Sequence, residues 1–262
     1  MIWPHHERAV EKWVEAIRPN PEFLAVIFAG SLTKGYGSES SDIDGFVVVT
    51  ADEYQRRQAA GDFFYWNPEI CDYEGGYVDA KYIDVEFIRR VAERGSEPAR
   101  SAFQGAQVRW SRIDGLSELC DRAAAYPEVG VDERISRFRA QMLFGQWFTG
   151  EAAKRDNPYL AHLAANKVIL FGARMILAEN RILYPYHKWL LKALSQVPDL
   201  PADLLEDIDR LARTATPACA DAVVNTILAY RNWPEAANRW PNDVMRDSEL
   251  NWLDHEPPIE DL

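Results

Sequence analysis

A change in sequence pattern near residue 128 constrains the fold more than any other feature. Before this point, apolar or β-branched runs alternate with helical patterns, and after it almost no strand pattern remains. Strands are predicted at 23–29, 42–50, 77–87 and 107–113. Helices are predicted at 5–18, at 52–58 and from the end of the third strand through Arg94. Strands mixed with helices in this way favour a layered α/β sheet.

Helical periodicity dominates the second half of the chain. Prolines separate the predicted helices, which lie at 132–150, 159–181, 186–196, 203–213 and 217–231. We therefore predict an α/β domain over 1–128, with a mixed sheet and flanking helices, followed by an all-α helical bundle over 129–262. The acidic, proline-bearing tail from 254 to 262 is expected to fray.

The composition favours a soluble cytoplasmic protein with small-molecule partners. No apolar run approaches the roughly 20 residues of a membrane helix, and the N-terminus has no signal-peptide pattern. Cys71, Cys120 and Cys219 form no CxxC pair, which is typical of reduced thiols. The net charge of −12 disfavours nucleic acid, since binding phosphate backbones needs a basic surface, and favours cationic small molecules. We expect no membrane partner, and a homodimer stays open.

The segment between the first two predicted strands carries the candidate site. An apolar strand ends at Gly30-Ser31, a glycine- and serine-rich loop follows, and Asp42 and Asp44 open the next strand. Gly30 lets a ligand approach the backbone, and the Ser31 hydroxyl and amide at the start of a short helix favour phosphate. Asp42 and Asp44, two residues apart on a strand, leave the same face, and such carboxylates suit Mg²⁺. An isolated D-x-D in a surface loop, with an Asx turn at Ser41-Asp42, is the simpler alternative.

This segment resembles the signature of the DNA polymerase beta-like nucleotidyltransferase superfamily, G-S-x₃-G-x₅-S-D-x-D. The fixed positions are matched by Gly30, Ser31, Gly35, Ser41, Asp42 and Asp44. The surrounding α/β pattern extends the resemblance to about residues 20–113. The helical half resembles, in layout only, that of the minimal nucleotidyltransferases and of the aminoglycoside and lincosamide adenylyltransferases. The resemblance implies a Gly-Ser turn that holds a triphosphate, two aspartates that bind two Mg²⁺ ions, and a third carboxylate on a neighbouring strand.

Three residues of the strand predicted at 77–87 could supply the third carboxylate. Strand alternation places Asp79 on one face with Lys81, whereas Asp84 and Glu86 share the other face and approach the following helix. Asp79 lies between small apolar neighbours, so an inward carboxylate there needs a cation. Asp84 is well placed to cap the next helix. We prefer Asp79 as catalytic residue and metal ligand, with Asp84 and Glu86 as alternatives, and we expect Lys81 to face the same cleft.

The predicted function follows from the resemblance. The chain is expected to be an enzyme that moves a nucleoside monophosphate, with AMP from ATP as the first choice among the triphosphates, to a hydroxyl of a small molecule such as an aminoglycoside-like antibiotic. Gly30, Ser31, Lys34 and Ser41 are expected to bind the nucleotide. A minimal nucleotidyltransferase of toxin–antitoxin type that modifies a protein, or a catalytically inactive nucleotide-binding protein, are the alternatives. The general base stays open.

A basic stripe in the helical half is a second candidate feature. Lys167, Arg174 and Arg181 recur every seven residues, so they share one side of an otherwise apolar helix. Lys167 and Arg174 are therefore expected to bind the triphosphate or an anionic acceptor. The alternative is that the stripe is only the solvated edge of that helix.

Overall fold

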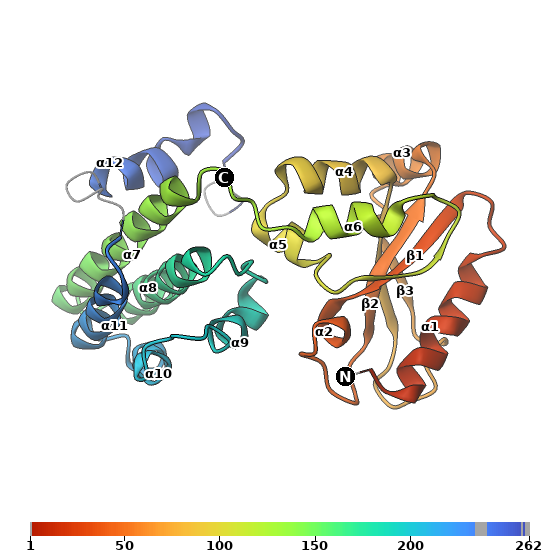
Figure 1. Cartoon of the computed structure of the whole chain (residues 1–262). Coiled ribbons are helices and arrows are strands. Elements are labelled where there is room, and N and C mark those ends of the chain that lie inside the picture. The colour runs from red at the N-terminus through yellow and green to blue at the C-terminus, as the bar shows by residue number, and fades with distance from the viewer. Residues whose placement is uncertain (1, 234–239, 258, 260–262) are drawn as a thin grey trace. The chain divides into compact units, whose positions relative to one another are not determined.

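The computed structural model divides the chain into two units, Met1–Tyr126 and Pro127–Leu262 (Figure 1). It describes residues 2–233, 240–257 and 259. The division lies beside the change in sequence pattern near 128. Residues 258 and 260–262 of the tail that is expected to fray lie outside the described residues.

A five-stranded mixed sheet with the order β3-β4-β2-β1-β5 forms the centre of the first unit. The strands are β1 (Phe23–Ala29), β2 (Ile43–Val49), β3 (Phe64–Asn67), β4 (Val78–Ile83) and β5 (Gln107–Ser111). Strands β2 and β4 are parallel, and the other neighbouring pairs are antiparallel. The prediction of a mixed sheet with flanking helices is confirmed. Strand β3 was not predicted, because its four residues have no apolar alternation and lie at the sheet edge, exposed or half-buried.

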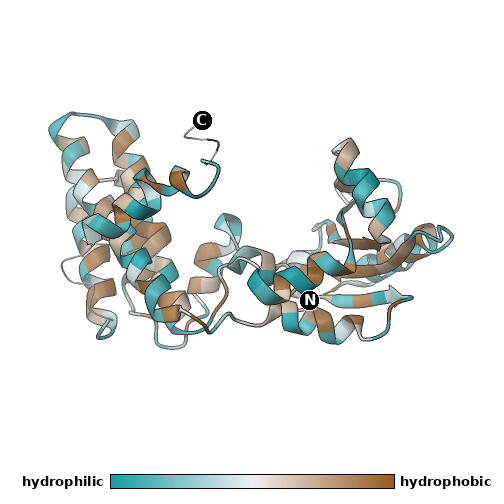
Figure 2. Cartoon of the chain, turned by 90° about the horizontal axis from the view of Figure 1, so that it is seen from above, coloured by the Kyte–Doolittle hydropathy of each residue, from teal (hydrophilic) through white to brown (hydrophobic). Residues whose placement is uncertain are grey.

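The two faces of the sheet are covered by different helices. Helix α1 (Pro4–Ile17) packs through Trp13 and neighbouring apolar residues on one face. Helices α4 (Val85–Arg94), α5 (Glu97–Ser101) and α6 (Leu116–Ala124) cover the other face, and α3 (Ala51–Ala60) follows β2. Because β1 and β2 are buried on both faces, they are almost wholly apolar. Figure 2 shows hydrophobic and hydrophilic residues alternating along the helices.

Side-chain caps decide where several helices of this unit begin. The Thr50 hydroxyl accepts a hydrogen bond from the amide of Glu53 at the start of α3. The Asp84 carboxylate accepts one from the amide of Phe87 at 2.7 Å, so it is the N-cap of α4. The strand predicted at 77–87 therefore ends at Ile83, and its last residues belong to the cap and first turn of a helix. This is a correction to the predicted boundary.

The regular secondary structure among the described residues of the second unit is all helical, as predicted. Its main helices are α7 (Val131–Lys154), α8 (Pro158–Glu179), α9 (Leu190–Leu194), α10 (Leu204–Thr214), α11 (Pro217–Tyr230) and α12 (Trp240–Val244). Helices α7 and α8 form a hairpin, and α8 also contacts α9, α10 and α11. The helix predicted at 186–196 is a 3-10 turn, η1 (His187–Trp189), followed by the short α9. Helix α12, the π-helical segment η2 (Met245–Glu249) and the 3-10 turn η3 (Asn251–Leu253) were not predicted.

Helix α8 is the core helix of this second unit. By length and composition it is the one helix among the described residues that could cross a membrane. Its run is interrupted by Lys167 and Arg174, which is why the sequence shows no continuous apolar stretch. Core helices of soluble proteins meet the same criterion, and the buried residues of α8 pack within the bundle.

Candidate metal and nucleotide site

Three aspartates converge where the neighbouring strands β2 and β4 begin, at one end of the first unit's sheet. Asp42, Asp44 and Asp79 each offer a carboxylate oxygen, and these oxygens lie within 4.8 Å of one another. Asp44 and Asp79 are partners in the register of the parallel strands β2 and β4, so they stand side by side. Asp42 immediately precedes β2 rather than lying within it. The predicted pair and the preferred third carboxylate are therefore brought together.

The direction of these side chains follows from strand alternation. Asp44 has the parity of Phe46 and Val48, which pack on the face that carries α4, α5 and α6. Asp79 has the parity of Lys81 and Ile83, and Ile83 packs on the same face. The expected sharing of a face by Asp79 and Lys81 is correct.

The two alternatives for the third carboxylate belong to helix α4 instead. Asp84 accepts the capping hydrogen bond described above. Glu86 lies in the first turn of α4 and forms ion pairs with Arg89 and Arg90 at 3.7 and 3.2 Å. Neither residue joins the group of carboxylates that includes Asp42.

Gly30 allows the turn after β1 to lie directly against Asp44. Its φ is +82°, and a Cβ atom at this position would lie 2.1 Å from Oδ2 of Asp44. Any side chain at this position would therefore displace the carboxylate, besides straining the backbone. Gly30 opens the short helix α2 (Gly30–Thr33), in which Ser31 is almost fully buried. The carbonyl of Ser31 accepts hydrogen bonds from the amides of Tyr36 and Gly37, which closes the loop back on the turn.

The loop that leads to Asp42 is held by contacts from several elements. The hydroxyl of Ser41 accepts a hydrogen bond from the amide of Ser38 at 2.9 Å. The phenol of Tyr73 donates to the carbonyl of Ser41 at 2.8 Å. His5, in the first turn of α1, lies 2.9 Å through Nε2 from the carbonyl of Glu39. Ser41, predicted to bind nucleotide, thus uses its hydroxyl to fix the loop.

The ionisation of the site reflects burial together with nearby negative charge. Burial raises the pKa of Asp79, and the charge of Asp42 adds to this effect while Lys81 opposes it. A hydrogen bond to Asp42, together with its negative charge, raises the pKa of the Tyr77 phenol. Both shifts indicate that removing a proton near these carboxylates is unfavourable when no cation is bound.

Lys34 supplies a cation near this end of the sheet. Its Nζ donates to the hydroxyl of Ser101 at 3.1 Å. Burial lowers the pKa of Lys34 to about 8, although the negative charge of Asp44 opposes the shift. Lys34, predicted to bind nucleotide, therefore loses its positive charge just above physiological pH, and an anionic neighbour such as a phosphate would stabilise its charged form.

The donor set fits divalent cations. All three candidate ligands are carboxylates, which are hard oxygen donors of the kind that Mg²⁺ prefers. Their oxygens lie close enough together for one ion to contact all three. Carboxylates this close repel one another unless a cation lies between them. Asp42, Asp44 and Asp79 would hold the metal.

Sequence reasoning missed residues that surround the site. Trp66 on β3 pairs with Asp79 in the antiparallel register, so the two side chains share a face, and Trp66 is 58% exposed. The run of aromatic residues from Phe63 to Trp66, between Gly61 and Asn67, was the available signal. Tyr73 and His5, which hold the loop, lie far from it in sequence and had no signal of their own.

The stripe of cations in the helical unit divides into two parts. Lys167 and Arg174, both on α8, line a pocket within that unit. Arg181 follows the end of α8 with a φ of +56°, and its Nε pairs with Glu128 at 2.8 Å. The guanidinium of Arg181 also donates to the carbonyl of Ala178, so it helps to close the helix C-terminus.

Comparison with known proteins gives a distant likeness to solved structures. No protein-family model matches the chain, and no curated protein matches it. Among solved structures, a nucleotidyltransferase-like protein from Exiguobacterium sibiricum 255-15 is similar to this chain, with a TM-score of 0.46 and 16% sequence identity. The match covers 94% of this chain and 86% of that chain.

Proposed function

We propose that this chain is a metal-dependent nucleotidyltransferase that moves a nucleoside monophosphate from a nucleoside triphosphate to a hydroxyl of a small molecule. The observation that carries the proposal is the convergence of Asp42, Asp44 and Asp79 within 4.8 Å beside the Gly30-Ser31 turn. A cluster of carboxylates next to a turn that can approach phosphate fits the general nucleotidyltransferase class. Mg²⁺ is the metal we propose, and ATP is the first triphosphate to test.

The reaction forms a bond between the acceptor oxygen and the α-phosphorus. It breaks the bond between that phosphorus and the oxygen that bridges the α- and β-phosphates. The acceptor loses its proton, and pyrophosphate leaves. Bound divalent ions would lower the pKa of the acceptor hydroxyl and offset the charge of the departing pyrophosphate. Ser31 and the neighbouring backbone would orient the phosphates, and the ammonium of Lys34 would attract them. Asp79, whose pKa is raised by burial, would receive the acceptor proton.

The acceptor is the part of the proposal that needs the widest test. The purified protein would be incubated with Mg²⁺ and each α-labelled triphosphate, together with hydroxylated small molecules that include aminoglycosides, or with a cell lysate. Label on a small molecule supports the proposal. Label on a protein band alone would replace the small-molecule acceptor by a protein, and binding without pyrophosphate release would refute the transfer reaction.

Matched variants connect any activity to the site. Asp42→Asn and Asp44→Asn should each reduce turnover by more than about 100-fold, the upper end of losses seen when only outer-shell partners of a metal are changed. Asp114→Asn is the control, because Asp114 is exposed in the same unit beyond β5. Ser111, three residues before Asp114, pairs with Ala25, which lies toward the end of β1 that is remote from Gly30. Turnover by Asp44→Asn at the level of Asp114→Asn would refute the site.

A further inference from the structure

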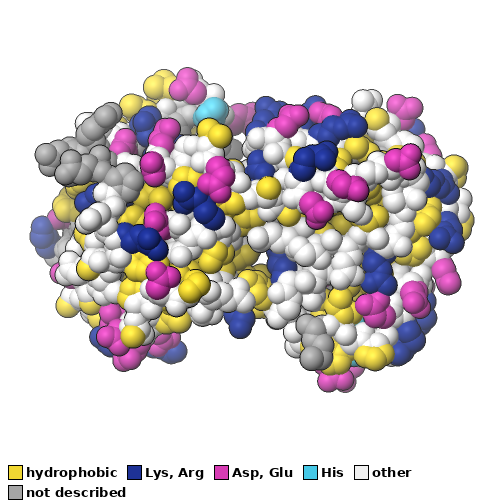
Figure 3. Space-filling view, viewed as in Figure 1, with side chains coloured by type: hydrophobic (Ala, Val, Ile, Leu, Met, Phe, Trp, Pro, Cys, Tyr) yellow, Lys and Arg dark blue, Asp and Glu magenta, His cyan; other side chains and the backbone are white. Residues whose placement is uncertain are grey.

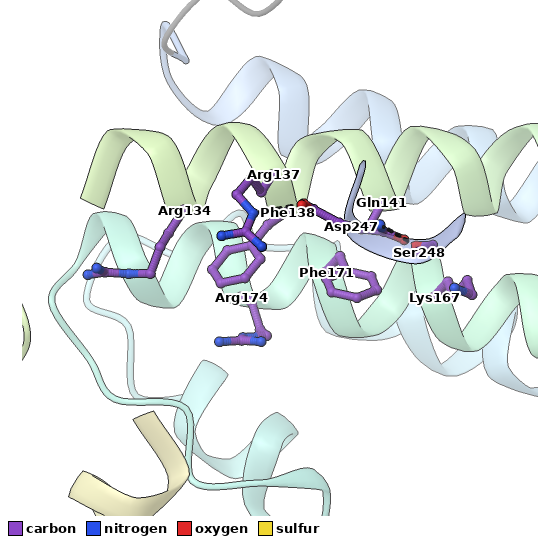
Figure 4. A pocket seen from close by; sticks show the side chains of 9 residues that line it. All are labelled: Arg134, Arg137, Phe138, Gln141, Lys167, Phe171, Arg174, Asp247 and Ser248. Carbon is purple, nitrogen blue, oxygen red and sulfur yellow. Dashed lines mark hydrogen bonds and ion pairs between the residues drawn. The ribbon is translucent and has the colours of Figure 1, made fainter. Parts of the chain in front are cut away.

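A pocket of about 360 Å³ lies within the helical unit, between α7, α8 and the segment η2. Its walls carry four cations, Arg134, Arg137, Lys167 and Arg174, and two aromatic rings, Phe138 and Phe171 (Figure 4). Its volume is within the range of roughly 300–1,000 Å³ that is typical of small-molecule sites. The carboxylates of the first unit play no part in its walls.

Helical spacing places these groups on facing surfaces. Arg134, Arg137 and Phe138 are three and four residues apart on α7, so they share one face of that helix. Lys167, Phe171 and Arg174 have the spacing of four and then three residues on α8. Because α7 and α8 form a hairpin, the two faces meet, and Figure 4 shows the rings between the helices with cations on both sides.

Two hydrogen-bonded contacts join η2 to α7 at the wall of the pocket. Nε of Arg137 lies 2.7 Å from Oδ2 of Asp247, and Nε2 of Gln141 donates to the hydroxyl of Ser248 at 2.9 Å. Gln141 is only 6% exposed, so this second contact is fixed within the wall. Asp247, the one acidic residue of the lining, also pairs with Arg246. The pocket therefore keeps an excess of positive charge in a chain whose net charge is −12.

Arg174 is held in a defined orientation. Its guanidinium lies over the ring of Phe138 at 4.1 Å and over the ring of Tyr184 at 4.8 Å. Stacking engages the faces of a guanidinium group, whereas carboxylate and phosphate oxygens bind its edges. An orientation set by two rings favours anion recognition, because less side-chain freedom is lost on binding.

We propose that this pocket binds a small molecule that carries at least two phosphate or carboxylate groups and an apolar or planar portion. The anionic groups pair with the cations of α7 and α8, and the apolar portion lies against Phe138 and Phe171. The proposal does not depend on the transfer reaction. A polycation is not expected to bind in this pocket, because the four cationic side chains of its wall would repel it. The occupant is either the acceptor of the transfer reaction or an effector, and both sources share this chemistry.

Calorimetric titration in EDTA tests the site without metal ions. The probes are inorganic pyrophosphate, AMP and ADP, with neomycin as the cationic comparison. Binding of at least one anionic probe should weaken by about tenfold or more in Lys167→Gln/Arg174→Gln, since the variant loses two charge-assisted contacts with the anion. Arg213→Gln removes one exposed cation from α10 in the same unit and should bind as the wild type does. Asp114→Asn, an exposed position in the first unit, should also bind as the wild type does.

Further variants keep the test decisive if the double variant unfolds. Lys167→Gln alone should weaken binding, and Lys167→Arg should restore it because the charge is kept. The absence of binding by every anionic probe, unchanged affinity in a folded Lys167→Gln, or tighter binding of neomycin than of AMP would each overturn the proposal. With Mg²⁺ and ATP added, nucleotidylation of the bound compound identifies an acceptor. A changed rate with no modification of the compound identifies an effector.

Discussion

Asp79→Asn removes one negative charge from the cluster of carboxylates while keeping nearly the same side-chain shape. The variant is expected to lose transfer activity, because Asp79 is proposed as a metal ligand and proton acceptor. It is also expected to make the metal-free protein more stable. The reason is that Asp42, Asp44 and Asp79 lie within 4.8 Å of one another, so their charges repel in the absence of a cation.

The size of the gain can be worked from this geometry. At 4.8 Å, the upper limit of the separations between these oxygens, two unit charges repel by about 1 kcal/mol in bulk water and by about 3.5 kcal/mol at an effective dielectric constant of roughly 20. Asp79 faces two such partners, but all three carboxylates are partly exposed, so the lower value applies. We expect Asp79→Asn to raise the free energy of unfolding by about 1–2 kcal/mol, which is a rise of roughly 2–8 °C in Tm for a chain of this size.

The gain should depend on pH in a defined direction. Burial raises the pKa of Asp79 in the folded protein above its ordinary value of 3.8. The folded state therefore holds this proton more tightly than the unfolded state, and the wild type loses stability as pH rises from about 3.8 through the raised pKa. The advantage of Asp79→Asn is accordingly full at neutral pH and absent in acid, below the ordinary value.

Thermal unfolding in EDTA and in saturating Mg²⁺ is the assay, with transfer activity measured in parallel. Mg²⁺ should stabilise the wild type by about 2.7 kcal/mol at 100 times its Kd, and it should stabilise Asp79→Asn much less. Asp114→Asn makes the same substitution at an exposed position and should leave both quantities unchanged. A lower Tm for metal-free Asp79→Asn, or an undiminished response to Mg²⁺, would refute the reasoning.

Three further outcomes are expected. The KM for the triphosphate should rise as pH increases through about 8, where Lys34 loses its charge, and Lys34→Met should flatten this profile. Between about pH 8 and 10.5 the metal-free wild type should become more stable, because the unfolded state keeps the proton that folded Lys34 releases. Gly30→Ala should lower turnover by at least about tenfold, since its Cβ displaces Asp44, and left-handed strain should lower the free energy of unfolding by about 1–2 kcal/mol. Gly61→Ala, at φ +70° in open space, carries the same backbone strain and should keep full turnover. An equal loss of turnover in both variants would exclude displacement of Asp44 as the cause. Trp66→Ala should raise the KM for nucleotide or acceptor by about 2–10-fold, whereas Trp66→Phe keeps an aromatic face, and unchanged KM values would remove Trp66 from the site.

The surface is consistent with recognition at defined pockets. On the face shown in Figure 3, acidic and basic side chains are interspersed over both units. The concentrated charges described above lie in two places, the carboxylates at the end of the sheet and the cations of the helical pocket. Net charge alone favours cationic partners, whereas the local charge of the pocket favours anions, and short-range groups dominate at a screened surface.

The sequence alone determined the class of each unit and the core of the candidate site. Strands β1 and β2 are apolar on both faces, which identifies central strands, and the turn at Gly30-Ser31 and the aspartates that open β2 are contiguous in the chain. Local patterns of this kind are visible because the residues that interact are close in sequence. The loss of strand pattern near 128 was informative for the same reason.

The tertiary structure decided what depends on strand partners and helix faces. Strand alternation favoured Asp79, but only the register of β2 with β4 places it beside Asp44, and only the start of α4 assigns Asp84 to a cap. Strand β3 has an aromatic run but no apolar alternation, and its position in the sheet is set by its pairing with β4. The helical pocket joins residues of α7 and α8 with the segment η2, more than 60 residues away along the chain. Such contacts between distant segments are set by packing, and no local propensity encodes them.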